Sequence, residues 1–111
     1  MINRMTVMSK KVNLLLPVFN EEGNIVEVYN AVKAVFNTIP AYEYDILFVD
    51  DGSTDGTYNA ISEQFIRDYR IKCISLSRNF GHQNALMAGM QHASGDLIVT
   101  MDGDLQPPPE L

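Results

Sequence analysis

The chain has 111 residues, which suits one domain or part of one, and it carries a formal net charge of −6. Its eight Lys and Arg residues are scattered, whereas binding to a nucleic-acid backbone needs clustered cations, so the composition argues against a nucleic-acid partner. An acidic chain that handles phosphate groups needs a metal ion or helix N-termini to offset the repulsion.

A single cysteine, Cys73, lies in an apolar alternation over residues 71–76, so no internal disulfide can form and a reducing compartment is favoured. The thiol is predicted to fill space in the core rather than to react. No stretch has the apolar length needed to span a bilayer, so the chain as given is predicted to be soluble.

The chain is predicted to begin with a leader, a strand and a helix. Residues 1–10 lack periodicity and are predicted to be a flexible leader. Residues 12–16 form an almost continuous apolar run, typical of a strand buried on both faces of a parallel sheet, and Pro17 is expected to end its ladder. Apolar positions recur at helical spacing over residues 25–36, and Pro40 closes that segment.

The alternation of strand and helix continues along the chain. Apolar runs predict strands over residues 45–49, 71–76 and 96–101, and helical spacing predicts helices over residues 58–69 and 83–93. Strands that alternate with helices in this way predict an α/β fold, with a mainly parallel, Rossmann-like sheet covered by helices on both faces.

Every polar cluster follows the carboxyl end of a predicted strand. In an open α/β sheet these ends meet at the edge where ligands bind. The clusters are Asn20-Glu21, Asp50-Asp51, Arg78-Asn79 and Asp102 to Asp104. The sequence therefore predicts one ligand site along this edge.

The last cluster has the spacing of a metal site. Asp102 and Asp104 are two residues apart in an extended segment and project from one face, which Gln106 continues with a neutral oxygen. Such oxygen ligands suit Mg²⁺ or Mn²⁺, and Gly103 lets a ligand approach the backbone. An Asp-Gly hairpin turn is an alternative that the prolines at 107–109 disfavour. A calcium loop would need a further Glu beyond the last residue.

Several ligand classes use this edge, and the motifs separate them. A dinucleotide site needs G-x-G-x-x-G after the first strand and a P-loop needs a Gly-Lys-Ser/Thr turn, and the sequence has neither. A receiver-type signalling domain also gathers acidic residues at this edge, but it carries its acidic pair after the first strand, whereas Asp50-Asp51 follows the second predicted strand. A nucleotide that carries a diphosphate fits better, because Asp50 or Asp51 can accept hydrogen bonds from a base or a ribose. A turn with a helix cap would explain one of these two aspartates.

Four segments resemble family 2 glycosyltransferases of the GT-A fold. The nearest likeness is to the polyprenyl-phosphate branch, which holds dolichol-phosphate mannosyltransferase-like and bactoprenol glucosyltransferase-like enzymes. The segments are PVFNEE at 17–22, VDDGSTDGT at 49–57, RNFGHQ at 78–83 and MDGDLQ at 101–106. The resemblance implies that residues 11–111 are the N-terminal, nucleotide-sugar-binding part of a glycosyltransferase domain, truncated before the acceptor half.

The resemblance also implies a nucleotide-sugar pocket. Asp50 would contact the base, with Asp51 nearby. Asp102 and Asp104 would form the DxD motif that binds metal and diphosphate, and Gln106 would be a further metal ligand. The residues implied to line the pocket are Pro17, Phe19, Glu21, Asp50, Asp51, Asp102, Gly103 and Asp104.

Some positions depart from the family pattern or stay open. Gly103 stands where alanine is more usual, and Pro107 stands where His or Asp is often found. Arg78 would either balance charge at the diphosphate or brace its own loop. His82 is interpreted as the residue that starts a helix rather than as a catalytic group.

The function implied by the resemblance is inverting transfer of a sugar from a UDP- or GDP-sugar to a polyprenyl phosphate, with Mg²⁺ or Mn²⁺ as cofactor. The general base and the membrane contact are expected beyond residue 111, with the full-length parent at the cytoplasmic face of the membrane. The fragment alone is expected to bind nucleotide weakly or not at all and to transfer no sugar. The alternative is a GT-A-like nucleotide-binding or scaffolding module that lacks catalysis.

Overall fold

The computed structural model describes residues 10–101, and these form one parallel sheet in the order β3-β2-β1-β4. The strands are β1 (Lys10–Val18), β2 (Tyr42–Asp50), β3 (Ile71–Ser75) and β4 (Leu97–Thr100). The helices are the 3₁₀ turn η1 (Glu22–Asn24), α1 (Ile25–Asn37), α2 (Thr57–Arg67) and α3 (His82–His92). The predicted parallel α/β fold is confirmed.

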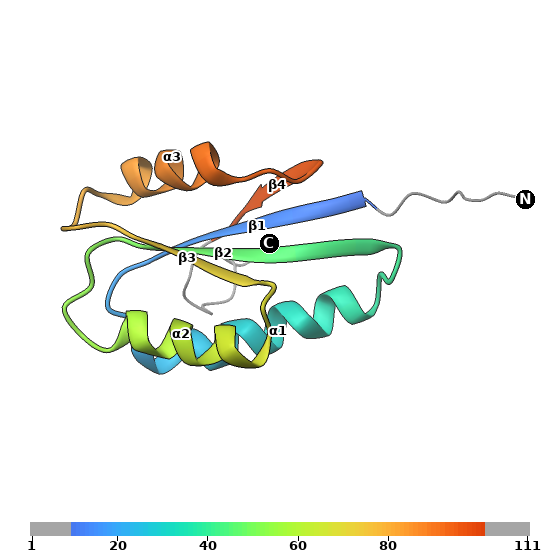
Figure 1. Ribbon diagram of the computed structural model, residues 1–111, viewed down its shortest axis with the longest axis horizontal. Coiled ribbons are helices and arrows are strands. Elements are labelled where there is room, and N and C mark those ends of the chain that lie inside the picture. The colour runs from blue at the N-terminus through green and yellow to red at the C-terminus, as the bar shows by residue number, and fades with distance from the viewer. Residues whose placement is uncertain (1–9, 102–111) are drawn as a thin grey trace, which may run out of the picture.

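The sheet is the middle of three layers. Helices α1 and α2 cover one face, and α3 lies on the other (Figure 1). The larger core lies on the α1 and α2 side, where Leu16 and Phe48 are fully buried. On the α3 side Gly89 packs so closely that a Cβ there would stand 2.9 Å from Leu15 and Val49. Both faces of β1 are therefore buried, which explains its unbroken apolar run.

Strand β1 continues through Pro17, so the prediction that this proline ends the ladder was wrong. The N–H and C=O of one residue in a parallel strand point to the same side, and successive residues alternate sides. The Leu15 oxygen accepts a bond from Met101 after β4, whereas the Val18 oxygen accepts one from Asp51 after β2. Pro17 shares the side of Leu15, and the β4 pairing ends at Leu15 with Thr100, so the missing N–H of Pro17 interrupts no pairing.

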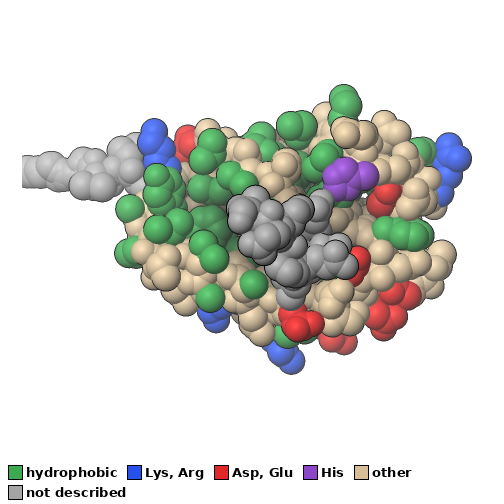
Figure 2. Space-filling view, turned by 180° about the vertical axis from the view of Figure 1, so that it is seen from behind, with side chains coloured by type: hydrophobic (Ala, Val, Ile, Leu, Met, Phe, Trp, Pro, Cys, Tyr) green, Lys and Arg blue, Asp and Glu red, His purple; other side chains and the backbone are tan. Residues whose placement is uncertain are grey.

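The edge of the sheet formed by β4 carries an apolar groove. Strand β4 pairs with β1, and all four of its residues are exposed. The groove holds about 250 Å³ between α1, β1 and β4 and has an almost wholly apolar lining. Figure 2 shows hydrophobic side chains gathered on this side of the molecule. No helix in the described part of the chain is long and apolar enough to cross a membrane.

Candidate functional site at the carboxyl edge of the sheet

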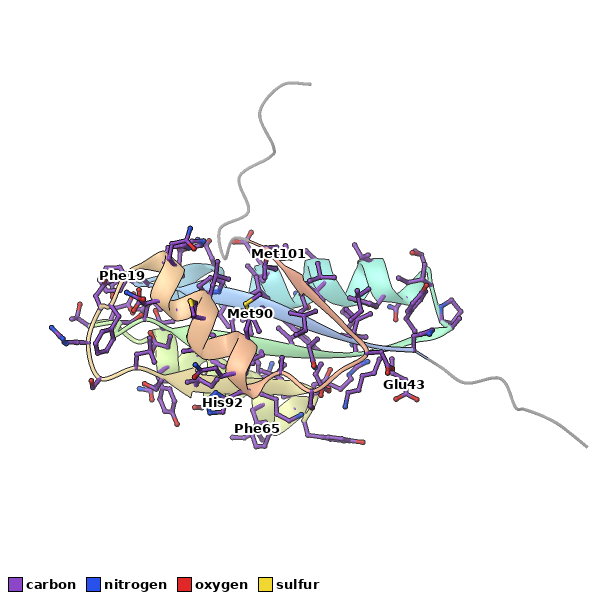
Figure 3. All side chains as sticks on the ribbon, turned by 90° about the horizontal axis from the view of Figure 1, so that it is seen from above. Phe19, Glu43, Phe65, Met90, His92 and Met101 are labelled. Atoms are coloured by element: carbon purple, nitrogen blue, oxygen red, sulfur yellow. The ribbon has the colours of Figure 1, made fainter. Side chains whose placement is uncertain are left out.

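Loops after β1, β2 and β3 meet at the carboxyl edge of the sheet, as predicted (Figure 1). Figure 3 shows Phe19 of the first loop at this edge, whereas Glu43 near the start of β2 lies at the opposite end. Phe19 is 42% exposed, and Pro17 just before it is buried in β1. The edge therefore presents an aromatic side chain to solvent on a rigid strand end.

Asp50 and Asp51 are both buried, at 2% and 4% exposure, but they have different partners. One carboxylate oxygen of Asp50 accepts the N–H of Ser53 at 3.0 Å, and no donor among residues 10–101 bonds the other. Asp51 accepts the Phe80 N–H at 2.8 Å on Oδ1 and the Gly81 N–H at 3.1 Å on Oδ2. Asp50 thus keeps an oxygen for a ligand, whereas Asp51 uses both oxygens to hold the loop after β3.

Gly52 lets the second and third loops touch. Its φ is +75°, a conformation that side chains other than glycine rarely adopt. A Cβ at this position would overlap the backbone of Arg78 and Asn79. The Asp-Gly pair at 51–52 therefore serves both a turn and a close backbone contact.

The first loop is fastened to the second by reciprocal bonds that sequence reasoning did not identify. Asn20, at φ +54°, donates its N–H to the Ser53 hydroxyl at 2.8 Å, and its side-chain oxygen accepts the Thr54 N–H at 2.8 Å. The Glu22 carboxylate accepts the Gly56 N–H at 3.0 Å, so it caps the start of α2 from outside that helix. The signal available in the sequence was Asn20 itself, because Asn adopts a positive φ more readily than most residues and so can mark a turn.

Glu21 and Arg78, two other predicted site residues, lie at the same edge. Glu21 donates its N–H to the buried Thr57 hydroxyl at 2.8 Å, and its carboxylate accepts the Asn24 side-chain amide at 2.7 Å. Arg78 is exposed, and its guanidinium lies 4.5 Å from the centre of the Phe80 ring. The structure thus brings both residues to the edge that holds Asp50.

The predicted metal ligands Asp102, Asp104 and Gln106, together with Gly103, lie outside the described residues. Strand β4 runs parallel to β1 and ends at Thr100 toward the same edge. Within residues 10–101 no group of three or more His, Cys, Asp or Glu side chains could hold a metal ion. The donor set of the implied metal site therefore stays a prediction from the sequence.

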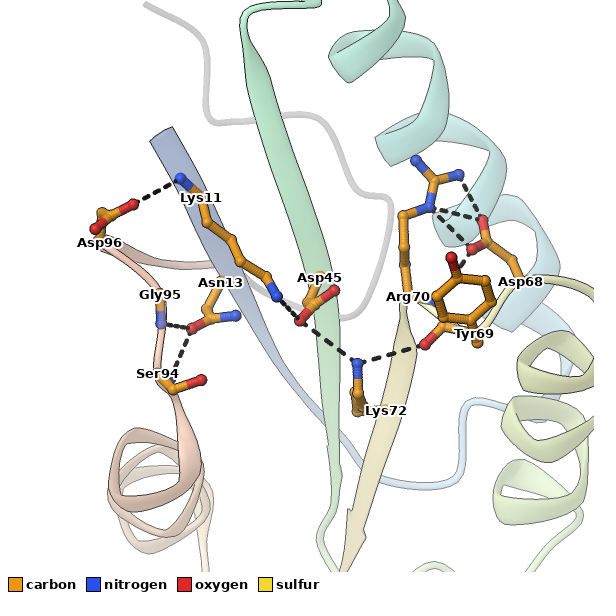
Figure 4. Close-up of polar contacts among 10 residues, drawn as sticks. All are labelled: Lys11, Asn13, Asp45, Asp68, Tyr69, Arg70, Lys72, Ser94, Gly95 and Asp96. Carbon is orange, nitrogen blue, oxygen red and sulfur yellow. Dashed lines mark hydrogen bonds and ion pairs between the residues drawn. The ribbon is translucent and has the colours of Figure 1, made fainter. Parts of the chain in front are cut away.

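Charged groups also gather at the opposite, amino end of the strands, where they brace the fold (Figure 4). Asp45 pairs with Lys11 at 2.9 Å and with Lys72 at 3.4 Å. The Asp68 carboxylate takes two donors from Arg70, at 2.6 Å and 2.9 Å, and this pairing lowers the pKa of Asp68. These acids are paired with cations, whereas Asp50 and Asp51 at the carboxyl edge have no cation partner within residues 10–101.

The remaining predictions on single residues concern Cys73 and His82. Cys73 packs against the core cluster, and burial raises the pKa of its thiol to about 12. The thiol therefore stays protonated at neutral pH, which agrees with its predicted role as a space-filling side chain. His82 is the first residue of α3, which confirms its interpretation as a helix-start residue.

Comparison with known proteins gives matches over most of the chain. The model of glycosyl transferase family 2 matches residues 14–111. An uncharacterized glycosyltransferase of Bacillus subtilis, YkcC, is 46% identical over 99 residues, which are 89% of this chain and 30% of that protein. The bactoprenol glucosyl transferase of Shigella phage SfV is 43% identical over 101 residues, 91% of this chain and 33% of its own. The chain thus spans about a third of the length of these relatives.

Solved structures share the fold. The mannosyltransferase PcManGT from Pyrobaculum calidifontis, in complex with GDP-Man and Mn²⁺, superposes with a TM-score of 0.77 and 23% identity. The superposition covers 91% of this chain and 29% of the PcManGT chain. Staphylococcus aureus TarS 1–349 in complex with UDP superposes with a TM-score of 0.68 and 26% identity, over 85% of this chain and 27% of the TarS chain. The parallel sheet with its helices is the one found in GT-A glycosyltransferases, as the sequence predicted.

Proposed function

We propose, because the chain belongs to glycosyl transferase family 2, that it supplies the donor-binding half of an inverting, metal-dependent sugar transfer from a nucleoside-diphosphate sugar to a polyprenyl phosphate. The observation that carries this proposal is the buried Asp50 carboxylate, which ends β2 at the ligand edge and keeps one oxygen without a donor from the described residues. A buried acceptor-only group at this point suits the N–H or hydroxyl donors of a nucleoside.

The rest of the pocket is assigned around Asp50. Pro17, Phe19 and Glu21 would line the nucleoside on the side of β1, where Phe19 offers an exposed ring for stacking. Arg78 would approach the diphosphate and balance part of its charge. Complexes of PcManGT with GDP-Man and of TarS with UDP support a nucleoside-diphosphate donor at this fold.

The metal site fits the proposal by its chemistry. Two carboxylates and an amide oxygen, from Asp102, Asp104 and Gln106, are the hard ligands that Mg²⁺ and Mn²⁺ prefer. When bound, the ion would neutralise the negative charge of the diphosphate leaving group. Strand β4 delivers the chain to the carboxyl edge just before Asp102, which supports a shared site with Asp50.

The acceptor is assigned from the relatives. Those of 43% and 39% identity are a bactoprenol glucosyl transferase and an undecaprenyl-phosphate 4-deoxy-4-formamido-L-arabinose transferase. Both names refer to a polyprenyl carrier, so we assign a polyprenyl phosphate as the acceptor and the cytoplasmic face of a membrane as the location of the complete enzyme. A phosphate oxygen is already anionic at neutral pH, which reduces the need for a general base.

Nucleotide titration followed by amide NMR signals tests the donor site on the 111-residue chain itself. We expect millimolar UDP or GDP with Mg²⁺ to shift amide signals of residues 17–24 and 50–56 selectively, because these segments lie at the edge that holds the Asp50 oxygen without a donor among residues 10–101. The variant Asp50→Ala should lose these shifts while the strand signals stay in place. The control Asp55→Asn, in the same loop, should keep them.

Two results would count against the donor site. One is that the nucleotide shifts amide signals throughout the chain rather than selectively in these two segments. The other is an equal response in Asp50→Ala and the unmodified chain, which would place the nucleotide elsewhere. A binding module without catalysis would give the expected shifts but no sugar transfer when it replaces the matching residues of a bactoprenol glucosyl transferase.

A further inference from the structure

We propose that Asp51 is a positioning residue, which holds the loop of residues 76–81 and through it the Arg78 guanidinium at the carboxyl edge. The role of Arg78 at a diphosphate rests on the proposed function, whereas the tether between Asp51 and the loop does not. The proposal divides the work of the two aspartates: Asp50 contacts the ligand and Asp51 orders the pocket wall.

Asp51 is engaged by the loop through both of its carboxylate oxygens. Its carboxylate is 4% exposed and takes one backbone N–H on each oxygen, from Phe80 and Gly81. Bonds to an ionised acceptor are the stronger kind, and losing one partner leaves a buried charge under-solvated. Both oxygens of Asp51 are therefore engaged by the loop, whereas one oxygen of Asp50 accepts no bond from the described residues.

Two other polar contacts lie at the ends of the loop: the Leu76 N–H donates to the Asp50 backbone oxygen at 2.9 Å, and the Asn84 side-chain amide donates to the Phe80 oxygen at 2.8 Å. In the described part of the chain, the backbone N–H groups of residues 77–81 make no long-range hydrogen bonds except those to Asp51. Gly81, the N-cap of α3 at φ +99°, offers no side-chain cap. The close approach of Gly52 to the Arg78 backbone adds a steric stop beside this tether.

Phe80 connects the tether to Arg78. The Phe80 N–H bonds to Asp51, and the Phe80 ring lies 4.5 Å from the Arg78 guanidinium carbon. A cation at this distance from an aromatic face is attracted to the ring, so fixing the Phe80 backbone restricts the guanidinium as well. The path runs from the Asp51 carboxylate through the Phe80 backbone and ring to Arg78.

Amide hydrogen exchange on the 111-residue chain tests the tether without any ligand. In Asp51→Asn the side chain keeps a single oxygen acceptor, so at least one of the Phe80 and Gly81 amides loses its bond. We expect exchange of these two amides to accelerate at least about tenfold while β1 and β2 amides keep their protection. The matched control is Asp55→Asn, because Asp55 also accepts backbone N–H groups, from Thr57 and Glu22, but accepts none from the loop of residues 76–81. Unchanged exchange at Phe80 and Gly81 in a folded Asp51→Asn variant would overturn the proposal.

A second variant tests the link to Arg78 and does not disturb the carboxylate. Phe80→Leu removes the ring but keeps the backbone N–H, and Phe80 is exposed enough to be replaced without unfolding. The side-chain N–H signal of Arg78 should move toward its value in an unfolded peptide, while the Phe80 and Gly81 amides stay protected. An Arg78 signal that does not move would overturn this link. Both experiments are run without nucleotide, so a failure of the tether can be distinguished from a failure of the proposed function.

Discussion

Asp50 and Asp51 show how two neighbouring residues of one type acquire different tasks. Successive side chains in an extended segment point to opposite sides, so these carboxylates cannot meet the same partner in the same way. Asp50 bonds within its own turn, to Ser53, whereas Asp51 reaches across to the loop after β3. This division could not be read from the sequence, because it depends on which backbone N–H groups the fold places beside each carboxylate.

Gly52 gives a direct test of the packing between the loops. We expect Gly52→Ala to destabilise the chain by about 2–4 kcal/mol, because the new Cβ is strained at φ +75° and overlaps the backbone of Arg78 and Asn79. Urea denaturation measures the loss. Gly23→Ala is the matched control, since a Cβ there meets nothing within 4 Å. Equal stability of the two variants would show that the loops do not pack as described.

Asp68 makes stability depend on pH. Bonds from Arg70 and from the Tyr29 hydroxyl lower the pKa of Asp68 below its value in the unfolded chain. A group with a depressed folded pKa stabilises the fold fully above its unfolded pKa, near 4, and this contribution is lost as the pH falls toward the folded pKa.

The prediction is a loss of unfolding free energy on acidification below about pH 4 that is smaller in Asp68→Asn. Urea denaturation from pH 2.5 to 7 provides the measurement. Glu63→Gln, at an exposed position on α2, is the control and should retain the acid dependence of the unmodified chain. The same slope in Asp68→Asn would contradict the assigned ion pair.

At the scale of elements, strand β4 is attached to the sheet by few bonds. It pairs with β1 over four residues, and the turn before it is held by Asn13, whose buried side-chain oxygen accepts the N–H groups of Ser94 and Gly95. The Asp96 carboxylate also accepts the Lys11 N–H at 2.9 Å. Asn13, the polar residue inside the apolar run of β1, therefore holds the turn that leads into β4, together with the contact between Asp96 and Lys11.

Replacing Asn13 should loosen β4 more than the rest of the sheet. Asn13→Ala leaves the Ser94 and Gly95 N–H groups without their acceptor, so we expect a loss of about 1–3 kcal/mol and faster amide exchange in residues 97–100. Exchange in β2 should change only by the global loss of stability. Asn30→Ala, at an exposed position on α1, is the control. Uniform acceleration across all strands would contradict a local role.

The elements themselves were predictable, because apolar runs and helical spacing report burial directly. Each of the strands β1 to β4 and helices α1 to α3 overlaps its predicted range, although β1 begins at Lys10 rather than at residue 12 and β2 at Tyr42 rather than at residue 45. The ladder through Pro17 was not predictable, because it depends on where β4 stops on the neighbouring side. The bonds of Asn20 and Glu22 to the loop before α2 join segments more than thirty residues apart, so a local pattern can mark a turn at Asn20 but cannot identify the segment that it meets.

At the scale of the whole molecule, charge is divided between the two ends of the sheet. At the amino end, Asp45 and Asp68 are paired with Lys and Arg side chains. At the carboxyl end, Asp50 and Asp51 bond to backbone N–H groups and to no cation among the described residues. That end is therefore the acidic one, and a divalent cation together with a nucleoside diphosphate would suit it better than the phosphates alone.

Sugar transfer by a chimera would show whether the carboxyl edge of this chain is a sugar-nucleotide site. The 101 matched residues of the SfV bactoprenol glucosyl transferase would be replaced by those of this chain, and transfer from UDP-glucose and GDP-glucose to a polyprenyl phosphate would be followed with and without Mg²⁺ or Mn²⁺. We predict metal-dependent transfer that Asp104→Ala abolishes. Asp50→Ala should reduce kcat/KM about tenfold to hundredfold, the value of a hydrogen bond to a charged acceptor, and Asp55→Asn should leave it unchanged. A folded chimera that transfers no sugar, or one whose transfer is unaffected by Asp50→Ala and Asp104→Ala, would contradict the assignment of this edge as a sugar-nucleotide site.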